Sequence, residues 1–547
     1  MQPKPLRKPR ILVTIALIAS LSGSNYLVRS SPAKSIDYSF SFDDNGITIT
    51  NITYRDDQVA NGTVWMLVPK GSGKWSLSVS EGTLDRSTLA DVGMVFYDNL
   101  SLFYTGPVTI LINWTMEYGA LLLEPQGLFV SPAVLASSDV PGYATLSLPD
   151  DVERINYATP RYTEISHHVL QFDLRQVMQN PEAVGRIYIY FSVSGQQQVE
   201  AFTEGNYTIN TASRYRNLAD RVLSVYTEAA PILQRLFNTT LGHTYVEFFV
   251  PHSAEEMPIG GFVPILPDRF SVGNISLNLF YFRTQEGYIE SIALHELVHQ
   301  YVAKSGISPY LLWLHEGLAN YVGIQLTYYL GLPGARDLED SLVFEAARIP
   351  QSEYHIIDGW TPSRTNPSYS VFQHYAIAFE IVREIGSAFQ GEGEPFPGYD
   401  YYDALFRSIE EKGELPNSTW QVLSAMEFAA PNGSKVASMF RSWDFDIPDV
   451  FQIYSQILSL KETLRNPSPL ISPFVPSMMA KLDEAERLLR SNEILMAQEL
   501  VMEVEAFINR MWMLMAVLIV MGVTAAFSVV YARKVKRSVE VDVEVGP

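Results

Sequence analysis

Two histidines four residues apart, His295 and His299, constrain the fold of this chain more than any other feature of its sequence. Residues four apart on a helix lie on one face, so both imidazoles can reach the same metal ion. Glu296 lies about 100° further round such a helix, which aims its carboxylate at the open side of the metal. Apolar residues at helical spacing predict this helix over 286–304, with an end near Gly306.

A second helical run follows and carries a candidate third ligand. It starts at Pro309, contains Glu316 seventeen residues after His299, and is ended by Gly331 and Pro333. A helix, a break and a second helix can bring Glu316 against the two histidines, leaving a fourth position for water at one zinc ion. The alternative is a pair of helix histidines that bond to neighbouring carboxylates without a metal.

These motifs resemble a known group of enzymes. His-Glu-Leu-Val-His at 295–299 and Trp-Leu-His-Glu-Gly-Leu-Ala-Asn-Tyr at 313–321 look like the gluzincin zinc metallopeptidases. The second motif is most similar to the aminopeptidase N family and the peptidase MA-like domains, and the resemblance covers about 207–460. It implies a zinc held by His295, His299 and Glu316, Glu296 as general base, and Asn320 as a residue that orients a ligand histidine.

The resemblance also implies a mechanism. A zinc-bound water would attack the peptide bond while Glu296 takes its proton and passes it to the leaving amine. The oxyanion needs a further donor, which in the aminopeptidase N family is a tyrosine at the start of a later helix. Tyr369 is the favoured candidate here; Tyr375, which also fits a core position, and His374 are the alternatives.

A missing motif bears on the kind of cleavage. The family's Gly-x-Met-Glu-Asn stretch, whose Glu holds a substrate's amino terminus, has no counterpart in residues 257–273. This favours an endopeptidase over an aminopeptidase. Residues 276–282 are expected to form an edge strand that aligns an extended peptide, and Gly260-Gly261 is either a substrate loop or a simple turn.

Two apolar segments predict the location. Residues 1–31 combine basic residues with a short apolar run, as in a signal peptide or signal anchor. Residues 511–531 contain no charge and have the length of a transmembrane helix. Basic residues follow at once, so the tail at 532–547 is expected in the cytoplasm, with the bulk of this single-pass cell-membrane protein outside.

Composition agrees with an exterior location. Nine Asn-x-Ser/Thr sequons lie between the two apolar segments, and the chain has no cysteine, which excludes disulfides and cysteine chemistry. Together with one membrane anchor, this pattern is typical of an archaeal surface glycoprotein. A net charge of −21 argues against nucleic-acid binding, so the expected partners are a peptide or protein substrate and the membrane.

The chain is expected to have several domains. Short β-type runs over 32–203 predict a sandwich-like β-rich domain, and 204–460 an α+β zinc metallopeptidase domain with a mainly helical C-terminal part. Within it, helical spacing begins near Thr208. Residues 461–510 predict a helical stalk, with a partner-binding coiled coil as the alternative. His167 and His168 point to opposite faces of a strand and are not expected to share a metal.

Two alternatives to a peptidase remain. A catalytically degenerate relative would keep zinc and bind a surface partner, although Glu296 is not needed in a purely structural site. A surface glycoprotein without metal is the other, and the placement of Glu316 opposite the histidines argues against it.

Overall fold

The computed structural model describes residues 34–543 except 59, 71–74, 93–96, 135–139, 180–184, 197, 267–270, 284–286, 363, 414, 431–433 and 492. The expected signal segment at 1–31 lies outside the described residues. The chain divides into two compact units, 1–194 and 195–547. The division falls before the expected boundary at 203/204, because β13 (Val199–Glu204) pairs with β14 (Tyr207–Ala212) in the sheet of the second unit.

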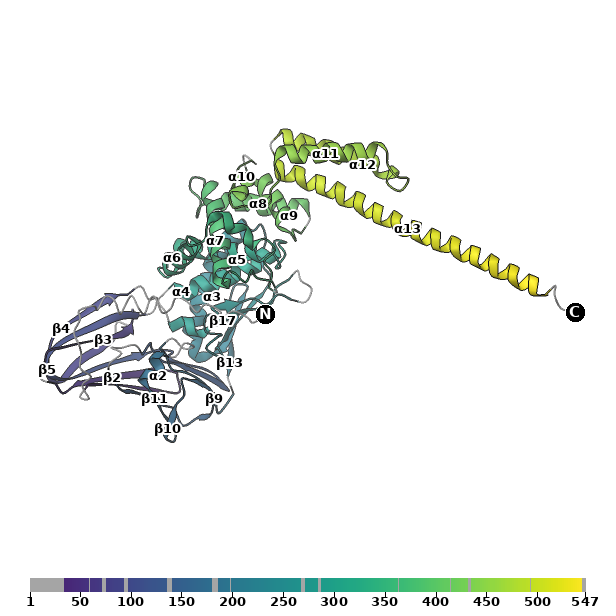
Figure 1. The fold of residues 1–547 in the computed structure, drawn as a ribbon. Coiled ribbons are helices and arrows are strands. Elements are labelled where there is room, and N and C mark those ends of the chain that lie inside the picture. Colours follow the sequence, from purple (N-terminus) through teal and green to yellow (C-terminus); the bar gives the residue numbers. More distant parts are fainter. Residues whose placement is uncertain are drawn as a thin grey trace. The chain divides into compact units, whose positions relative to one another are not determined.

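The first unit consists mainly of strands in two sheets (Figure 1). The larger sheet has the order β10-β11-β8-β1-β2-β5-β3 with β4 also paired to β5, and the smaller has the order β6-β7-β12-β9. The elements are β1 (Lys34–Phe42), β2 (Thr48–Asp56), β3 (Gly62–Pro69), β4 (Ser76–Asp91), β5 (Tyr97–Met116), β6 (Ala120–Leu123), β7 (Gln126–Val130), β8 (Tyr143–Ser147), β9 (Val152–Thr159), β10 (Thr163–Ser166), β11 (Val169–Asp173), α2 (Leu174–Gln179) and β12 (Tyr188–Val193).

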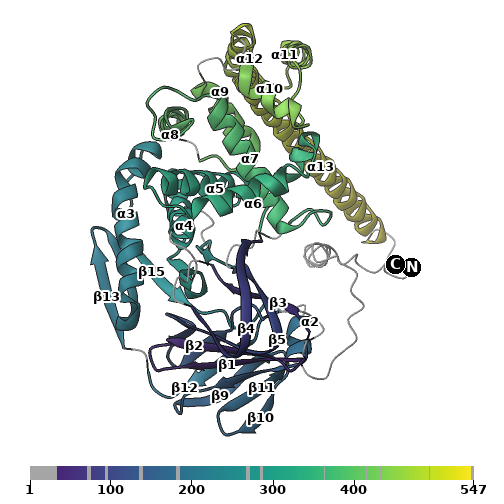
Figure 2. The same cartoon turned by 90° about the vertical axis from the view of Figure 1, so that its left-hand side faces the viewer.

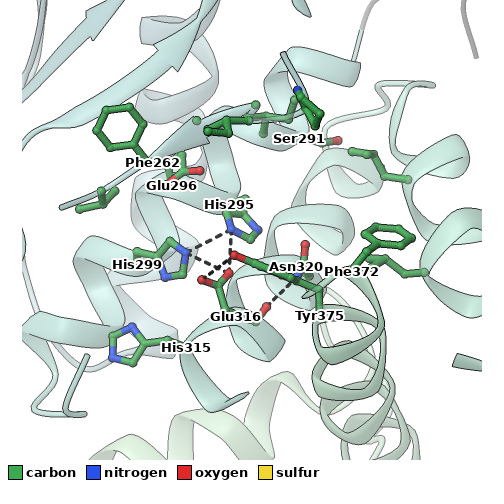
Figure 3. A pocket seen from close by; sticks show the side chains of 18 of the residues that line it. Phe262, Ser291, His295, Glu296, His299, His315, Glu316, Asn320, Phe372 and Tyr375 are labelled. Carbon is green, nitrogen blue, oxygen red and sulfur yellow. Dashed lines mark hydrogen bonds and ion pairs between the residues drawn. The ribbon is translucent and has the colours of Figure 1, made fainter. Parts of the chain in front are cut away.

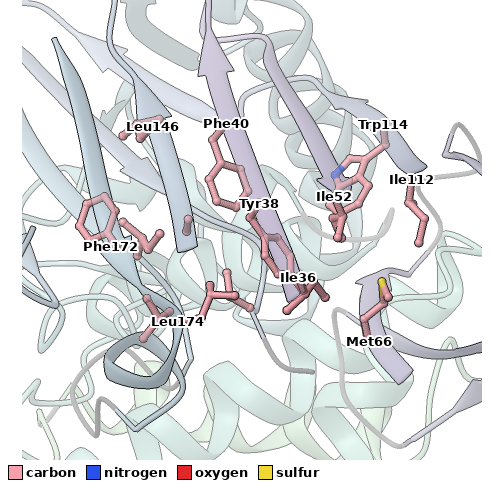
Figure 4. Packing of buried hydrophobic residues seen from close by; sticks show 14 of the residues in the cluster. Ile36, Tyr38, Phe40, Ile52, Met66, Ile112, Trp114, Leu146, Phe172 and Leu174 are labelled. Atoms are coloured by element: carbon pink, nitrogen blue, oxygen red, sulfur yellow. The ribbon is translucent and has the colours of Figure 1, made fainter. Parts of the chain in front are cut away.

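Alternation along the strands builds the core of this unit. In β1 every second residue is buried, and Ile36, Tyr38 and Phe40 point to the same side of the sheet (Figure 4). Phe40 contacts Phe129 of the smaller sheet, with ring centroids 5.7 Å apart, so the two sheets share one core. The larger sheet is mixed rather than purely antiparallel, because β1 and β8 run parallel.

The second unit begins with a five-stranded mixed sheet of order β13-β14-β15-β17-β16. Its remaining strands are β15 (Thr244–Phe249), β16 (Gly261–Phe262) and β17 (Ile275–Asn278). The expected edge strand at 276–282 is therefore wrong: β17 is internal and leads into the 3-10 turn η2 (Leu279–Arg283), while β16 forms the edge. The helical pattern expected from Thr208 likewise starts later, because 207–212 is β14.

Helices form the rest of the unit, and α4 packs against both α3 and α5 (Figure 2). A side-chain cap fixes the start of α7, because Ser370 accepts a hydrogen bond from the main-chain N–H of Gln373. The elements are η1 (Ser213–Tyr215), α3 (Arg216–Leu236), α4 (Tyr288–Lys304), α5 (Leu312–Tyr329), α6 (Ala335–Ala346), η3 (Gln351–Ile357), α7 (Val371–Ala388), α8 (Tyr399–Lys412), α9 (Thr419–Ala429) and α10 (Ser434–Ser442).

The C-terminal part is a helical bundle from which one helix continues. α11 (Val450–Arg465), η4 (Ser472–Phe474), α12 (Val475–Arg490) and the first turns of α13 (Ile494–Val543) share an apolar core. α13 then runs on without a break, as the yellow helix in Figure 1. Among the described residues, one helical stretch, Ile494–Arg533, is long and apolar enough to cross a membrane. Its most apolar segment has a mean hydropathy of 2.5 and is not buried against other parts of the protein.

Candidate metal centre

Three side chains from two helices converge on one point. The Nε2 atoms of His295 and His299 on α4 lie 3.1 Å apart. Oε2 of Glu316 on α5 lies 3.3 Å from the first and 3.4 Å from the second (Figure 3). The three atoms therefore form a nearly equilateral triangle, and they come from the residues that the sequence predicts as ligands.

The triangle has the dimensions of a metal site. A tetrahedral zinc ion bonded at about 2.0–2.1 Å to nitrogen and oxygen holds its ligand atoms about 3.3–3.4 Å apart. Oε2 of Glu316 is buried and accepts no hydrogen bond of good geometry, although both imidazoles lie in contact distance. A buried carboxylate oxygen without a hydrogen bond is costly unless a cation compensates it. The donor set thus fits zinc.

Two glycines let the supporting helices approach closely enough to form the triangle. A Cβ on Gly323 of α5 would lie 3.1 Å from the main-chain nitrogen of His295. A Cβ on Gly317 would lie 2.6 Å from the carbonyl oxygen of Ala378 on α7. Both distances are shorter than ordinary contacts, so larger residues would push α5 away from α4 and α7. Gly317 follows Glu316 directly, which ties the position of that ligand to the packing of α7.

Glu296 lies beside the triangle with one oxygen unpaired. Its side chain is buried, and Oε2 has no hydrogen-bond partner among the described residues. Burial raises the pKa of this carboxyl, the two histidines lower it, and Glu316 raises it again, with a net increase. A Cβ on Gly261 of β16 would lie 2.9 Å from Oε1, so only glycine leaves room for Glu296 there. This role of Gly261 is not evident from the sequence.

The charges of the cluster set its protonation. Burial favours a neutral Glu316, but His299 and His295 outweigh it and hold the pKa of this carboxyl well below its usual range. Burial lowers the pKa of His299, yet the nearby carboxylates of Glu316 and Glu296 raise it by more, so the net change is upward. His315 stacks on His299, with ring centroids 5.8 Å apart. Burial and His299 lower the pKa of His315 to about 3, so it stays neutral and donates to the carbonyl of Ile307.

The structure places Tyr375, rather than Tyr369, at the metal centre. The Tyr375 hydroxyl donates to Oε1 of Glu316 at 3.3 Å, and its ring lines the cavity beside the ligands (Figure 3). Tyr369 precedes the first residue of α7, and its hydroxyl bonds to Glu353 of η3. The sequence favours Tyr369 over Tyr375. In the structure α7 begins two residues after Tyr369, so Tyr369 lies at η3 and Tyr375 faces the ligands. His374 is buried and accepts from the main-chain N–H of Asn366.

Asn320 lines the cavity but does not orient a ligand histidine. Its side-chain amide donates to the main-chain oxygen of Glu316 at 2.9 Å, one turn earlier on α5. This contact uses the amide nitrogen of Asn320, and among the described residues no imidazole donates to its amide oxygen. This contact holds Asn320 on the same face of α5 as Glu316.

A cavity of about 610 Å³ opens beside these residues. Its lining is mainly apolar and comes from the β16 region, α4, α5, α6 and the start of α7. The sequence gives no sign of the part played by α6, because its lining residues have the spacing of an ordinary core face. Those residues are Leu338, Ser341 and Leu342.

Comparisons with known proteins show distant likeness only. No protein-family profile and no curated protein matches the chain. Native leukotriene A4 hydrolase from Saccharomyces cerevisiae is a structural neighbour with TM-score 0.33 and 11% identity, over 83% of this chain and 77% of that one. An aminopeptidase N family protein from Idiomarina loihiensis is a second structural neighbour, with a TM-score of 0.30 and 14% identity. The match covers 70% of this chain and 71% of that one. Likeness of this degree carries no argument, so function rests on the residues of this chain.

Proposed function

We propose that this chain is a membrane-anchored, outward-facing zinc metallopeptidase that hydrolyses peptide bonds. One observation carries the proposal: the ligand triangle of His295, His299 and Glu316 lies beside a buried carboxylate, Glu296, that has an unpaired oxygen. A structural zinc site is closed by four protein ligands. Three ligands with an acid–base group and a cavity next to them are instead typical of a catalytic site.

The roles of the side chains follow from their positions. A zinc ion held by the triangle would polarise a peptide carbonyl and lower the pKa of a water molecule. Oε2 of Glu296 accepts a proton from that water and returns it to the leaving amine. The hydroxyl of Tyr375 donates a hydrogen bond to the developing oxyanion.

The edge strand β16 gives the substrate a place to bind. It pairs with β17 on one side only, and it lines the cavity together with Glu296. An extended peptide can add to such an edge by main-chain hydrogen bonds, which do not depend on a free terminus. With no Gly-x-Met-Glu-Asn stretch in the sequence, we favour internal cleavage over removal of amino-terminal residues.

The proposed location rests on α13 and on the sequons. We assign 511–531 as the transmembrane helix, 532–547 as a cytoplasmic tail and 461–510 as the stalk. The apolar stretch of α13 and the basic residues after it support this orientation. Seven of the eight sequon asparagines that the structure describes are exposed, and Asn99 is half-buried, which supports glycosylation outside the cell.

The substitution Glu296→Gln tests the proposed chemistry. The amide keeps the shape of the side chain but cannot take a proton from water. We expect one zinc per chain in both proteins, and a fall in kcat of about 10²–10⁴-fold or more in the variant, measured with peptides and mass spectrometry.

Matched outcomes separate the alternatives. Glu345 on α6 is half-buried, pairs with Arg348 and lies outside the cavity lining, so it serves as the control, and Glu345→Gln should leave kcat unchanged. Equal hydrolysis by Glu296→Gln and the wild type would remove Glu296 from the mechanism. Zinc without hydrolysis in the wild type would favour a binding protein, and trimming of single amino-terminal residues would favour an aminopeptidase.

A further inference from the structure

The cavity beside the metal centre has large apolar side chains exposed on two sides. On the strand side are Ile259 and Phe262, which are 43% and 45% exposed. On the helix side are Val371 and Phe372 at the start of α7, which are 54% and 47% exposed. We call these two pairs the strand rim and the helix rim. Figure 3 shows Phe262 and Phe372 on opposite sides of the three ligands.

The floor between the rims is apolar as well. Ile292 lies one turn before Glu296 on α4, and Ile324 lies two turns after Glu316 on α5. Leu338 and Leu342 are one turn apart on α6 and line the same cavity. Ile324 and Leu342 are buried, so they form the deep part of the floor. The apolar surface thus continues from the metal ligands to both rims.

Charged groups in the lining are confined to the metal centre. Among the described residues that line the cavity, the histidine and carboxylate side chains are His295, Glu296, His299, His315 and Glu316, and there is no lysine or arginine. A charged substrate side chain would lose its water there without gaining an opposite charge outside the centre. A large apolar side chain would instead bury its own surface and that of the rims.

We propose that the site accepts an extended segment with large apolar residues on both sides of the scissile bond, one against each rim. The inference rests on the proposed peptidase function and adds its substrate class. Exposed apolar patches next to a cavity mark binding sites, and rims on both sides of the ligands require partners on both sides of the bond. Folded proteins bury such segments, so the substrates are unfolded or unstructured chains.

Cleavage profiles of rim variants test this inference. The full chain, loaded with zinc in lipid nanodiscs, is given a mixed peptide library, and the cuts are read by mass spectrometry. We expect kcat/KM for Leu or Phe beside the bond to exceed that for Ala by about 10-fold or more, since one methylene in an apolar pocket is worth about 10–200-fold. Phe262→Asp and Phe372→Asp should each shift the preference towards Lys or Arg, at different positions relative to the bond.

The control is Phe344→Asp, which makes the same change on α6 at a residue that is 64% exposed and outside the cavity lining. Its cleavage profile should equal that of the wild type. An unchanged profile in both rim variants, or cleavage by the wild type without regard to apolar residues, would overturn the inference. Phe262 and Phe372 are already largely exposed to solvent, so replacing them with aspartate should not prevent folding.

Binding separates failure of the inference from failure of the proposed function. Glu296→Gln should bind a labelled peptide with two central leucines at least about 10-fold more tightly than the same peptide with two aspartates. If the wild type cuts nothing while this difference holds, the peptidase function is wrong and the apolar substrate site stands. If the two peptides bind equally, the inference is wrong whatever the activity.

Discussion

The two units of the chain each bury a cluster of ionisable side chains, and the clusters differ in how their atoms are paired. In the first unit, Asp56 accepts from the Tyr104 hydroxyl at 2.6 Å and from the Lys34 ammonium at 3.0 Å. Tyr104 in turn lies 2.6 Å from the hydroxyl of Tyr54. In the metal centre of the second unit, Glu296 and Glu316 each keep a buried oxygen without a hydrogen bond.

This difference separates a structural cluster from a functional one. The Asp56 cluster matches its buried charge with an ammonium and hydroxyl donors, so it stabilises the fold without needing a ligand. The candidate metal centre leaves carboxylate oxygens unpaired, and a cation of the size that the ligand triangle fits would compensate them. Both clusters are buried, so burial alone does not identify a site. Unpaired carboxylate oxygens that converge with two imidazoles distinguish the candidate metal centre.

Tyr375→Phe is expected to have a larger effect than the substitutions at Tyr104 and Glu427 described below. It removes the hydroxyl beside the metal ligands and keeps the ring, so zinc should stay bound. Loss of one oxyanion donor costs about 10²–10³-fold in kcat. Steady-state kinetics with the peptide cleaved best by the wild type measures it. Tyr369→Phe is the matched control, because that hydroxyl pairs with Glu353 away from the cavity, and its kcat should not change. A larger fall in kcat in Tyr369→Phe than in Tyr375→Phe would make Tyr369 the oxyanion donor.

Tyr104→Phe tests the paired cluster. Asp56 would lose a hydrogen bond to a buried charge, which costs about 1.5–3 kcal/mol of unfolding free energy. Urea unfolding and hydrogen exchange on β2 and β5 measure it, while kcat per bound zinc should stay the same. Tyr38→Phe is the control, because the buried Tyr38 hydroxyl has no partner within the part of the chain that the structure describes, so its loss should be neutral or stabilising. Equal destabilisation by both variants would contradict the pairing argument.

Glu427 on α9 lies between these two cases and gives an effect that depends on pH. One of its oxygens accepts from the main-chain N–H groups of Leu495 and Met496 at the start of α13, and the other is buried without a partner. Burial raises the pKa of Glu427 from 4.5 to about 7, although the N–H groups oppose this shift and Glu493 adds to it. The proton is therefore held more tightly in the folded state than in the unfolded one.

The sign of the pH effect follows from that difference. The stabilising contribution is complete below about pH 4.5 and is lost as the pH rises towards 7, by about 3 kcal/mol at most. Glu427→Gln should flatten this part of the stability curve, because the amide oxygen can still accept from Leu495 and Met496. Urea unfolding between pH 4.5 and 7.5 measures it. Glu499→Gln on the facing α13 is the control, and its unfolding free energy should depend on pH as in the wild type. Loss of that dependence in Glu499→Gln would show that Glu499, and not Glu427, causes it.

Periodic features of the fold could be predicted from the sequence. The helix predicted at 286–304 is α4 at Tyr288–Lys304, and the helix end predicted near Gly306 lies two residues after its last residue. Both follow from apolar spacing and helix-ending residues, which are local. Sheet order could not be predicted in this way, because the parallel pairing of β1 with β8 and the edge position of β16 depend on contacts between distant segments.

The site shows the same limit. The convergence of His295, His299 and Glu316 could be predicted, because two of them share one helix face and the third follows a single break in the chain. Tyr375 could not be chosen over Tyr369, since the choice depends on where α7 begins and which way it faces α5. The need for glycine at position 261 could not be predicted either, because it comes from contact with Glu296, which lies thirty-five positions away in the chain.

Metal content tests the central claim most directly. The full chain, purified in detergent, is incubated with zinc, freed of excess metal and measured by elemental analysis beside His299→Ala. The ligand triangle predicts one zinc per chain in the wild type and none in the variant, since two remaining ligands hold zinc weakly. A wild type without zinc, or a variant that keeps a full equivalent, would contradict the assignment of His295, His299 and Glu316 as a metal centre.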